Sequence, residues 1–205
     1  RDSGDTVPTM SPNYKDDIGA VFQYDLNGIN ASEFIAGKNQ SSKMKSQLNR
    51  LDHLGTSIFV TNSNIFIGAK DKNGGNGAVF KCDLSGDNCI IYKTDNLNLV
   101  TNDNFGTSLT GNGSNLFIGA IGRDSGSTSQ SNLYDTGSIF KCDFNIGNCF
   151  EFLGGQNQES RKQLGLSVNE NFGSSIITTS DFIYIGAFQY EQSCICGTSS
   201  NSGAC

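Results

Sequence analysis

The chain has 205 residues, a net charge of −6 and 36% hydrophobic residues. This acidic balance argues against nucleic acid and anionic membranes as partners, because both are bound by basic patches. No run approaches eighteen apolar residues, so the sequence predicts no transmembrane segment, and the 25 Gly and 14 Phe favour a folded, turn-rich chain.

Short strand-like segments recur along the chain in a fixed order. The first two read GAVFQYDL at 19–26 and SEFIAG at 32–37. A unit of four follows, with LGTSIFVTNSNIFIGA at 54–69, GAVFKCDL at 77–84 and CIIYK at 89–93. The next unit has FGTSLTGNGSNLFIGA at 105–120, GSIFKCDF at 137–144 and CFEFLG at 149–154, and FGSSIITTSDFIYIGA at 172–187 opens another. Each full unit predicts four short strands.

The spacing within the units separates a scaffold from its loops. The opening Leu or Phe and the Gly of IGA are always 14 positions apart, as from Phe105 to Gly119, which predicts a fixed two-stranded hairpin. In that hairpin, Leu109, Leu116 and Ile118 are expected on one face, with polar residues opposite. The distance from the same Gly to the next strand varies, which marks a surface loop.

Four-stranded antiparallel units repeated every fifty to sixty residues are typical of β-propeller blades. The sequence therefore predicts an all-β fold with about three blades' worth of chain, and a β-sandwich is the alternative. The predicted segments are half a blade at 1–37, blades at 54–93 and 105–154, and half a blade at 172–205.

The recurring FG, GA and GAVF pieces resemble the FG-GAP repeat of integrin α-subunit propellers. This resemblance implies an extracellular, non-enzymatic adhesion module, whose ligands and partner subunit bind the face where the variable loops open. Similar repeats also occur in propellers attached to secreted phospholipases, so an accessory domain of a secreted hydrolase is an alternative. Later integrin blades hold calcium in a D-x-D-x-D-G loop, but TNSN, GNGS and TTSD stand at those positions here. We therefore expect neither calcium in these blades nor another cofactor.

Both ends of the sequence fall at the same point of the repeat. RDSGDT at 1–6 resembles RDSGST at 123–128, and SGAC at 202–205 stands where the next GAVF begins. The sequence is thus expected to be a fragment of a longer propeller, or to be completed by another chain. In the second case the protein is a structural subunit of a glycosylated extracellular assembly or filament. The expected partners are other proteins or further copies of the chain.

The cysteine spacing predicts two local disulfides and an oxidising compartment. Cys82 and Cys89 are seven apart, as are Cys142 and Cys149, whereas the first unit has neither cysteine of the pair. Zinc is the competing interpretation, but the chain has a single histidine to complete such a site. Three further cysteines are candidates for other disulfides: Cys194, Cys196 and Cys205.

Three sequons agree with a secreted or cell-surface protein, and their candidate glycosylation sites are Asn30, Asn39 and Asn112. The sequence contains no enzyme signature, and His53 is interpreted as a solvated loop residue. Asp25, Asp83 and Asp143 are interpreted as side chains that stabilise turns. The longest loop supplies the candidate partner-binding residues, which are Arg123, Asp124, Tyr134 and Asp135.

Overall fold

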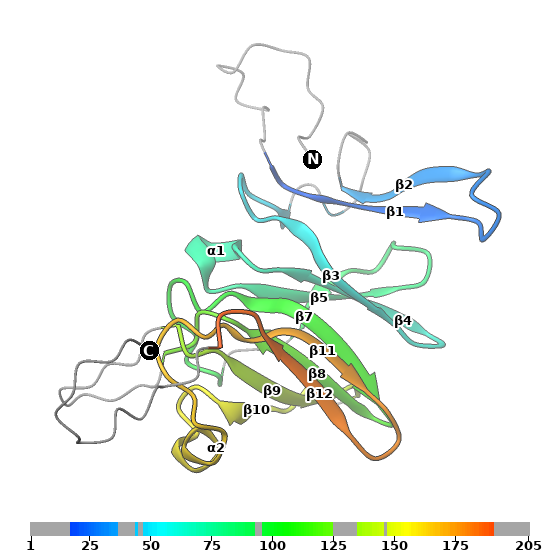
Figure 1. The fold of residues 1–205 in the computed structure, drawn as a ribbon. Helices are drawn as coiled ribbons and strands as arrows, with labels where there is room; N and C mark the ends of the chain where they lie inside the picture. Colours follow the sequence, from blue (N-terminus) through cyan, green and yellow to red (C-terminus); the bar gives the residue numbers. More distant parts are fainter. Residues whose placement is uncertain are drawn as a thin grey trace, which may run out of the picture.

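The computed structural model describes residues 17–36, 44, 47–92, 96–124, 135–145 and 147–190. These residues form four antiparallel sheets, none of which closes into a barrel, and two short helical segments (Figure 1). The prediction of an all-β fold is confirmed, with 49% of residues in strands and 7% in helices. The predicted four strands per full unit are present as two four-stranded sheets.

The sheets follow one another in chain order. The first has β1 (Ala20–Tyr24) and β2 (Ala31–Ala36). The second has β3 (Leu54–Val60), β4 (Asn64–Ala69), β5 (Ala78–Asp83) and β6 (Ile90–Ile91). The third has β7 (Phe105–Asn112), β8 (Asn115–Ala120), β9 (Ser138–Asp143) and β10 (Cys149–Gly154). The fourth has β11 (Phe172–Thr178) and β12 (Ile183–Ala187).

The helical segments are local features of the connections. The segment α1 (Lys72–Gly75) contains left-handed backbone at Asn73 and Gly74, so it is a pair of tight turns rather than a regular helix. The helix α2 (Gln158–Leu164) begins after Asn157, whose side chain accepts a hydrogen bond from the Ser160 amide, and ends at the left-handed Gly165.

The turn between the third and fourth strands of each unit is closed by an aspartate. The Asp83 carboxylate accepts hydrogen bonds from the Ser85 hydroxyl and the Asp87 amide, and these lower its pKa to about 2. Asp25 and Asp143 accept the amides of Ile29 and Asn145 in the same way. The interpretation of these three aspartates as turn residues is confirmed.

Phenylalanine rings fill the space between the sheets. Phe66, Phe80, Phe105 and Phe140 are fully buried, and the Phe105 and Phe140 rings meet edge to face at 5.3 Å between centroids. The predicted alternation of apolar and polar faces is wrong for β4 and β8. In β8, Phe117 is buried along with its neighbours Leu116 and Ile118, because sheets pack on both faces of this strand.

A glycine lets each sheet approach the next one closely. The Ser108 hydroxyl donates to the Gly173 carbonyl at 2.6 Å, and a side chain at Gly119 would overlap that same carbonyl oxygen. The second and third sheets repeat this arrangement, with Ser57 bonded to Gly106 at 2.7 Å beside Gly68. The glycine of IGA is thus required by the neighbouring backbone.

Substitution of this glycine gives the first test. We expect Gly119→Ala to lower the free energy of unfolding by about 2–3 kcal/mol, since the new methyl group displaces the backbone of β11. Gly186→Ala is the matched control, because the three atoms nearest to a methyl group there belong to the Ser174 and Ser175 side chains and not to the backbone of another strand. Urea unfolding at low protein concentration compares the two. Equal losses of stability would contradict the close-approach argument.

Candidate functional site

The connections of variable length come together at one end of the sheets. We call this the loop end and define it as residues 49–53, 70–76, 98–104, 121–124, 135–136, 155–157 and 167–171. The opposite, turn end carries the short hairpin turns near residues 25–30, 61–64, 84–88, 112–115, 144–148 and 178–182 (Figure 1). Hydrogen bonds join neighbouring connections at the loop end, as from the Gly122 amide to the Asp103 carbonyl at 3.2 Å.

A buried carboxylate precedes the opening strand in three consecutive units. Asp52, Asp103 and Glu170 are 2%, 0% and 1% exposed. Each accepts a hydrogen bond from the backbone amide three positions earlier, at 2.7 Å for Asp52 and 2.8 Å for the other two. These carboxylates therefore hold the turns that lead into β3, β7 and β11.

A buried cation pairs with two of these carboxylates. Lys72 Nζ lies 3.0 Å from Asp52 Oδ2, and Arg123 Nη1 lies 2.7 Å from Asp103 Oδ2. Lys72 and Arg123 are 51 positions apart, as are Asp52 and Asp103, so the two pairs are equivalent. Each pair ties a loop that follows a second strand to the turn before the first strand of the same unit.

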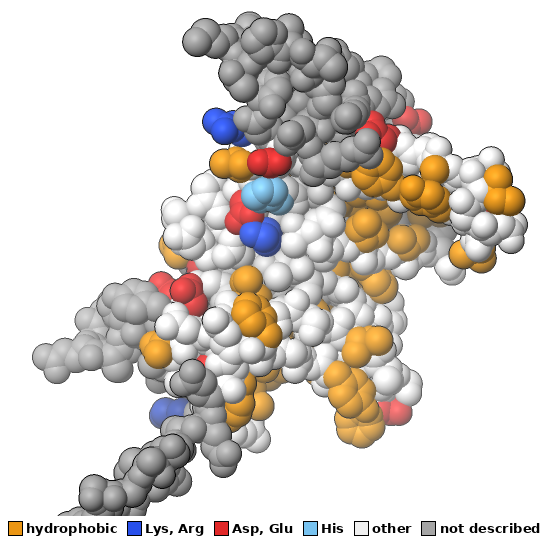
Figure 2. Space-filling model, turned by 45° about the horizontal axis from the view of Figure 1, so that its top comes forward, with side chains coloured by type: hydrophobic (Ala, Val, Ile, Leu, Met, Phe, Trp, Pro, Cys, Tyr) orange, Lys and Arg blue, Asp and Glu red, His pale blue; other side chains and the backbone are white. Residues whose placement is uncertain are grey.

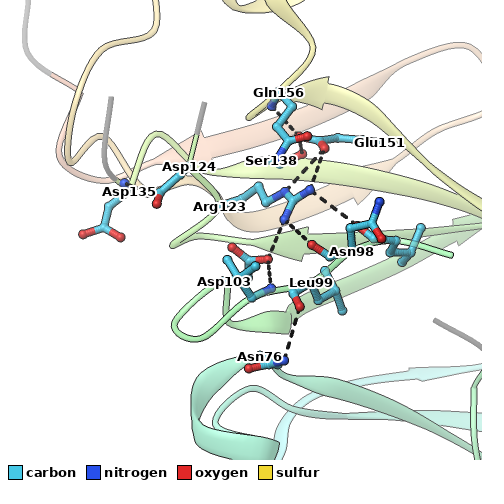
Figure 3. Close-up of polar contacts among 12 residues, drawn as sticks. Asn76, Asn98, Leu99, Asp103, Arg123, Asp124, Asp135, Ser138, Glu151 and Gln156 are labelled. Carbon is cyan, nitrogen blue, oxygen red and sulfur yellow. Dashed lines mark hydrogen bonds and ion pairs between the residues drawn. The ribbon is translucent and has the colours of Figure 1, made fainter. Parts of the chain in front are cut away.

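Arg123 is the most connected residue of the loop end (Figure 3). Its guanidinium also lies 3.4 Å from Glu151 Oε2 and donates to the Asn98 carbonyl at 3.0 Å. Burial raises the pKa of Asp103, and the Val100 amide and the Arg123 charge oppose that rise. A charged group at this depth is retained only with such partners, although Asp103 Oδ1 itself accepts no hydrogen bond from the described residues.

This position of Arg123 corrects the sequence analysis. The residue is only 2% exposed and its contacts are internal, so it supports the loop and is not an exposed anchor for a partner. Asp124 and Asp135 lie side by side away from it, and Asp124 Oδ1 accepts from the Asp135 amide at 3.0 Å (Figure 3). Burial and the Asp124 charge raise the pKa of Asp135. Tyr134 lies outside the described residues.

The single histidine belongs to a charged cluster at the surface of the loop end. His53 Nδ1 and Lys70 Nζ each lie 2.5 Å from Asp71 Oδ2, and Asn104 donates to Asp71 Oδ1 at 2.9 Å. Burial acts to raise the pKa of Asp71, but the hydrogen bonds and charges of Lys70 and His53 lower it overall. Figure 2 shows the histidine between acidic and basic side chains. The interpretation of His53 as a solvated loop residue is therefore only partly right, because 43% of its side chain is exposed and its ring contacts Asp71.

This cluster borders a shallow, open hollow of about 390 Å³ between three connections. Its lining comes from residues 49–53, Asp71, residues 73–75 and Asn102. Within the described ranges, no three His, Cys, Asp or Glu side chains are grouped closely enough to hold a metal ion. The arrangement offers hydrogen-bond donors and acceptors of both charges, which suits recognition of a polar surface.

Those predicted modification sites that the structure describes lie outside the loop end. Disulfides link Cys82 to Cys89 and Cys142 to Cys149, with Sγ–Sγ distances of 2.05 and 2.06 Å, and they indicate an oxidising, extracellular-type environment. At the turn end, the Asn30 amide donates to Asp25 at 2.8 Å and the Asn112 amide donates to the Ser180 carbonyl at 3.2 Å. Of the predicted modification sites, Asn39, Cys194, Cys196 and Cys205 lie outside the described residues.

Sequence reasoning missed the buried carboxylates and Lys72. Their signal is present in the repeats, because an acidic residue stands two positions before Leu54, Phe105 and Phe172.

Comparison with protein-family models and with curated protein sequences finds no match to this chain. The described part of the chain contains no helix of the length and apolar character needed to span a membrane.

The turn before β3 gives a test of the backbone at the loop end. Leu51 has a left-handed φ of 66°, and the equivalent residues Asn102 and Asn169 have φ values of 69° and 60°. We expect Leu51→Asn to raise the free energy of unfolding by about 1 kcal/mol, because asparagine tolerates this conformation better than leucine. Leu164→Asn in α2 is the control and should be destabilising. A lower urea midpoint for Leu51→Asn would contradict the prediction.

The third test removes one member of the buried Arg123–Asp103 ion pair. Asp103→Ala leaves the Arg123 charge with Glu151 alone, so we expect a loss of about 3–5 kcal/mol in the free energy of unfolding. The control is Asp181→Ala at the turn end, where the exposed carboxylate bonds only to the neighbouring Ser180 hydroxyl among the described residues. Chemical denaturation distinguishes them, and equal effects would show that the pair does not support the loop end.

Proposed function

We propose that the chain is part of an extracellular β-propeller of the FG-GAP, integrin-α-like type and acts as a non-enzymatic protein-interaction module. Two features support the propeller: each full unit forms a four-stranded antiparallel sheet, and the same serine–glycine contact joins consecutive sheets. The two disulfides support an extracellular setting, where such bonds persist.

The observation that carries the interaction function is the contrast between the loop end and its base. The connections differ in length from unit to unit, from Gly68 to Gly77 in one and from Gly119 to Gly137 in the next. Beneath them, the Lys72–Asp52 and Arg123–Asp103 pairs hold a constant, buried base. Variable loops on a fixed scaffold are a common way to build a binding surface.

The charge and polarity of the loop end favour a protein ligand over a small molecule. The hollow beside His53 is shallow and open, whereas pockets for small molecules usually enclose most of the ligand. The Lys70–Asp71–His53 cluster exposes groups of both signs on a broad surface. We infer that this surface and the loops around it contact a partner protein outside the cell.

Site-specific photo-crosslinking tests this function. A photoreactive residue is placed at Asn73, which is exposed at the loop end, and in a matched variant at Asn62, which is exposed at the turn end. Each variant is irradiated with secreted and cell-surface proteins of the source organism. We expect a specific adduct from position 73 that excess unlabelled chain competes away, and none from position 62. Equal labelling from both positions, or none from either, would contradict the proposal.

A further inference from the structure

The second and fourth sheets each contain half of a contact that the middle of the chain shows complete. Between the second and third sheets, the Ser57 hydroxyl donates to the Gly106 carbonyl at 2.7 Å. Between the third and fourth sheets, Ser108 donates to the Gly173 carbonyl at 2.6 Å. The contact therefore joins the opening strand of one unit to the opening strand of the next.

At the same repeat positions, one serine hydroxyl and one glycine carbonyl have no counterpart in this contact among the described residues. Ser175 in β11 is the third serine of the series and is exposed, whereas Ser108 is buried. Gly55 in β3 is the third glycine, and within the described residues no serine hydroxyl donates to its carbonyl. The unmatched hydroxyl and the unmatched carbonyl lie in the fourth and second sheets, which the third sheet separates (Figure 1).

The glycine of IGA, which contacts the backbone of the next sheet, also lacks its counterpart in the fourth sheet. Gly68 faces the Gly106 carbonyl and Gly119 faces the Gly173 carbonyl, so tightly that a methyl group has no room. At Gly186, the three atoms nearest to an added methyl group all belong to the side chains of Ser174 and Ser175. The fourth sheet thus has the shape to receive a strand that the described chain does not place there.

Apolar side chains are exposed on both halves. Tyr184 in β12 is 56% exposed, although the equivalent Phe66 and Phe117 are 0% and 8% exposed. Ile58 in β3 is 44% exposed, although the equivalent Leu109 is 9% exposed. The first difference shows that, among the described residues, no further sheet packs on the outer face of β12. The second shows that β3 lacks the two strands that the opening strand of a unit normally covers.

The acceptor side also has a hollow. An apolar space of about 400 Å³ lies between the first and second sheets, and Ile58, Val60, Tyr24, Phe34 and Leu84 are part of its lining. In Figure 2, hydrophobic side chains gather around this region. Between the second and third sheets, the stacked rings of Phe59 and Phe144 occupy the corresponding region, at 5.9 Å between centroids.

The pairing of the strand edges shows the same two unmatched halves. In the four-stranded sheets, β4 pairs with β5 and β8 pairs with β9. Among the described residues, β12, which is equivalent to β4 and β8, pairs only with β11. Likewise β1, which is equivalent to β5 and β9, pairs only with β2. One molecule therefore carries both strands of a missing pair, one at each end of its row of sheets (Figure 1).

We propose that the β11–β12 hairpin of one copy docks onto β1 and β3 of a second copy. The docking forms a four-stranded sheet in the order β11–β12–β1–β2, with Gly186 opposite Val21 of the second copy, as Gly68 is opposite Val79. The Ser175 hydroxyl donates to the carbonyl of Gly55 of the second copy, and Tyr184 covers Ile58 and Val60 there.

A second copy is the occupant that the structure favours, because the chain itself shows the completed joint twice between identical repeat positions. The contact is head-to-tail, since the donor and acceptor surfaces differ, so it leads to a ring or a filament. It goes beyond the proposed function, because it does not involve the loop end and holds whether or not the loops bind a partner.

Sedimentation velocity of the 205-residue chain between 1 and 100 µM tests the proposal. We expect multiples of the 21.9 kDa monomer that increase with concentration. Tyr184→Lys breaks the donor surface and Ile58→Lys breaks the acceptor surface, so each variant alone should be monomeric. The control is Ile90→Lys, an exposed residue of β6 outside both surfaces, and this variant should associate like the original chain.

Mixing the two broken variants gives the decisive result. Ile58→Lys retains its donor and Tyr184→Lys retains its acceptor, so an equimolar mixture should form a dimer of one copy of each and nothing larger. A monomeric mixture, a monomeric original chain at 100 µM, or association that all the variants retain would each overturn the proposal. Association retained by all the variants would indicate non-specific edge association. A monomeric mixture or a monomeric original chain would mean that other segments or partners cover these edges.

Two smaller changes guard against misfolded variants. Gly186→Ala should abolish association while the urea midpoint of the monomer stays unchanged, because the atoms of the same molecule nearest to the methyl group belong to two serine side chains. Ser175→Ala should raise the dissociation constant by about fivefold, the effect of losing one ordinary hydrogen bond. Association unaffected by Gly186→Ala would overturn the proposed register. Because the photo-crosslinking probe lies at the loop end, its failure and the failure of this proposal are separable.

Discussion

The close approach of consecutive sheets at one glycine is the contact on which the rest of the structure depends. At Gly68 and Gly119 the carbonyl of the next strand occupies the space of a side chain, and a serine hydroxyl satisfies that carbonyl. This contact fixes the distance between sheets, so the side chains on both faces of β4 and β8 are buried. The loop end inherits its geometry, because the connections begin and end at strands that are already in place.

The buried charges at the loop end follow from the same packing. Lys72 lies 5.8 Å above the Phe80 ring and Arg123 lies 5.9 Å from the centre of the equivalent Phe140 ring. A cation above an aromatic face is stabilised by the ring as well as by its carboxylate. Each of these two loops is thus anchored by one charge that contacts both the core and the turn before the first strand of its own unit. The remaining loop residues can differ between units without loss of this anchor.

Much of the fold could be predicted because the chain repeats itself. The constant separation of Phe105 and Gly119 predicts a hairpin, and the paired absence of two cysteines from the first unit predicts that Cys82 and Cys89 bond to each other. The burial of Phe117 could not be predicted from alternation, since it depends on a sheet that packs from the other side. Periodicity within a strand describes that strand, whereas burial depends on its neighbours.

The loop end was harder to predict for a different reason. Arg123 stands in a glycine- and serine-rich segment and has the composition of an exposed loop residue, yet it is buried between Asp103 and Glu151. Its partners are 20 and 28 positions away, and single-residue preferences contain no information on such pairs. Comparison of the repeats does contain it, because Lys72 and Asp52 occur at the same two positions.

The outer sheets of the described residues expose apolar side chains that the middle sheets bury. Terminal units of repeat proteins usually differ from the others and present a polar outer face to water. Here the fourth sheet keeps the residue types of the interior, and Ile177, Phe182 and Tyr184 are all more than half exposed. β3 likewise keeps Ile58 and Val60 on its exposed face. Faces of this composition have the chemistry of an interface, so the physical reasons that join the middle sheets also favour covering the outer ones.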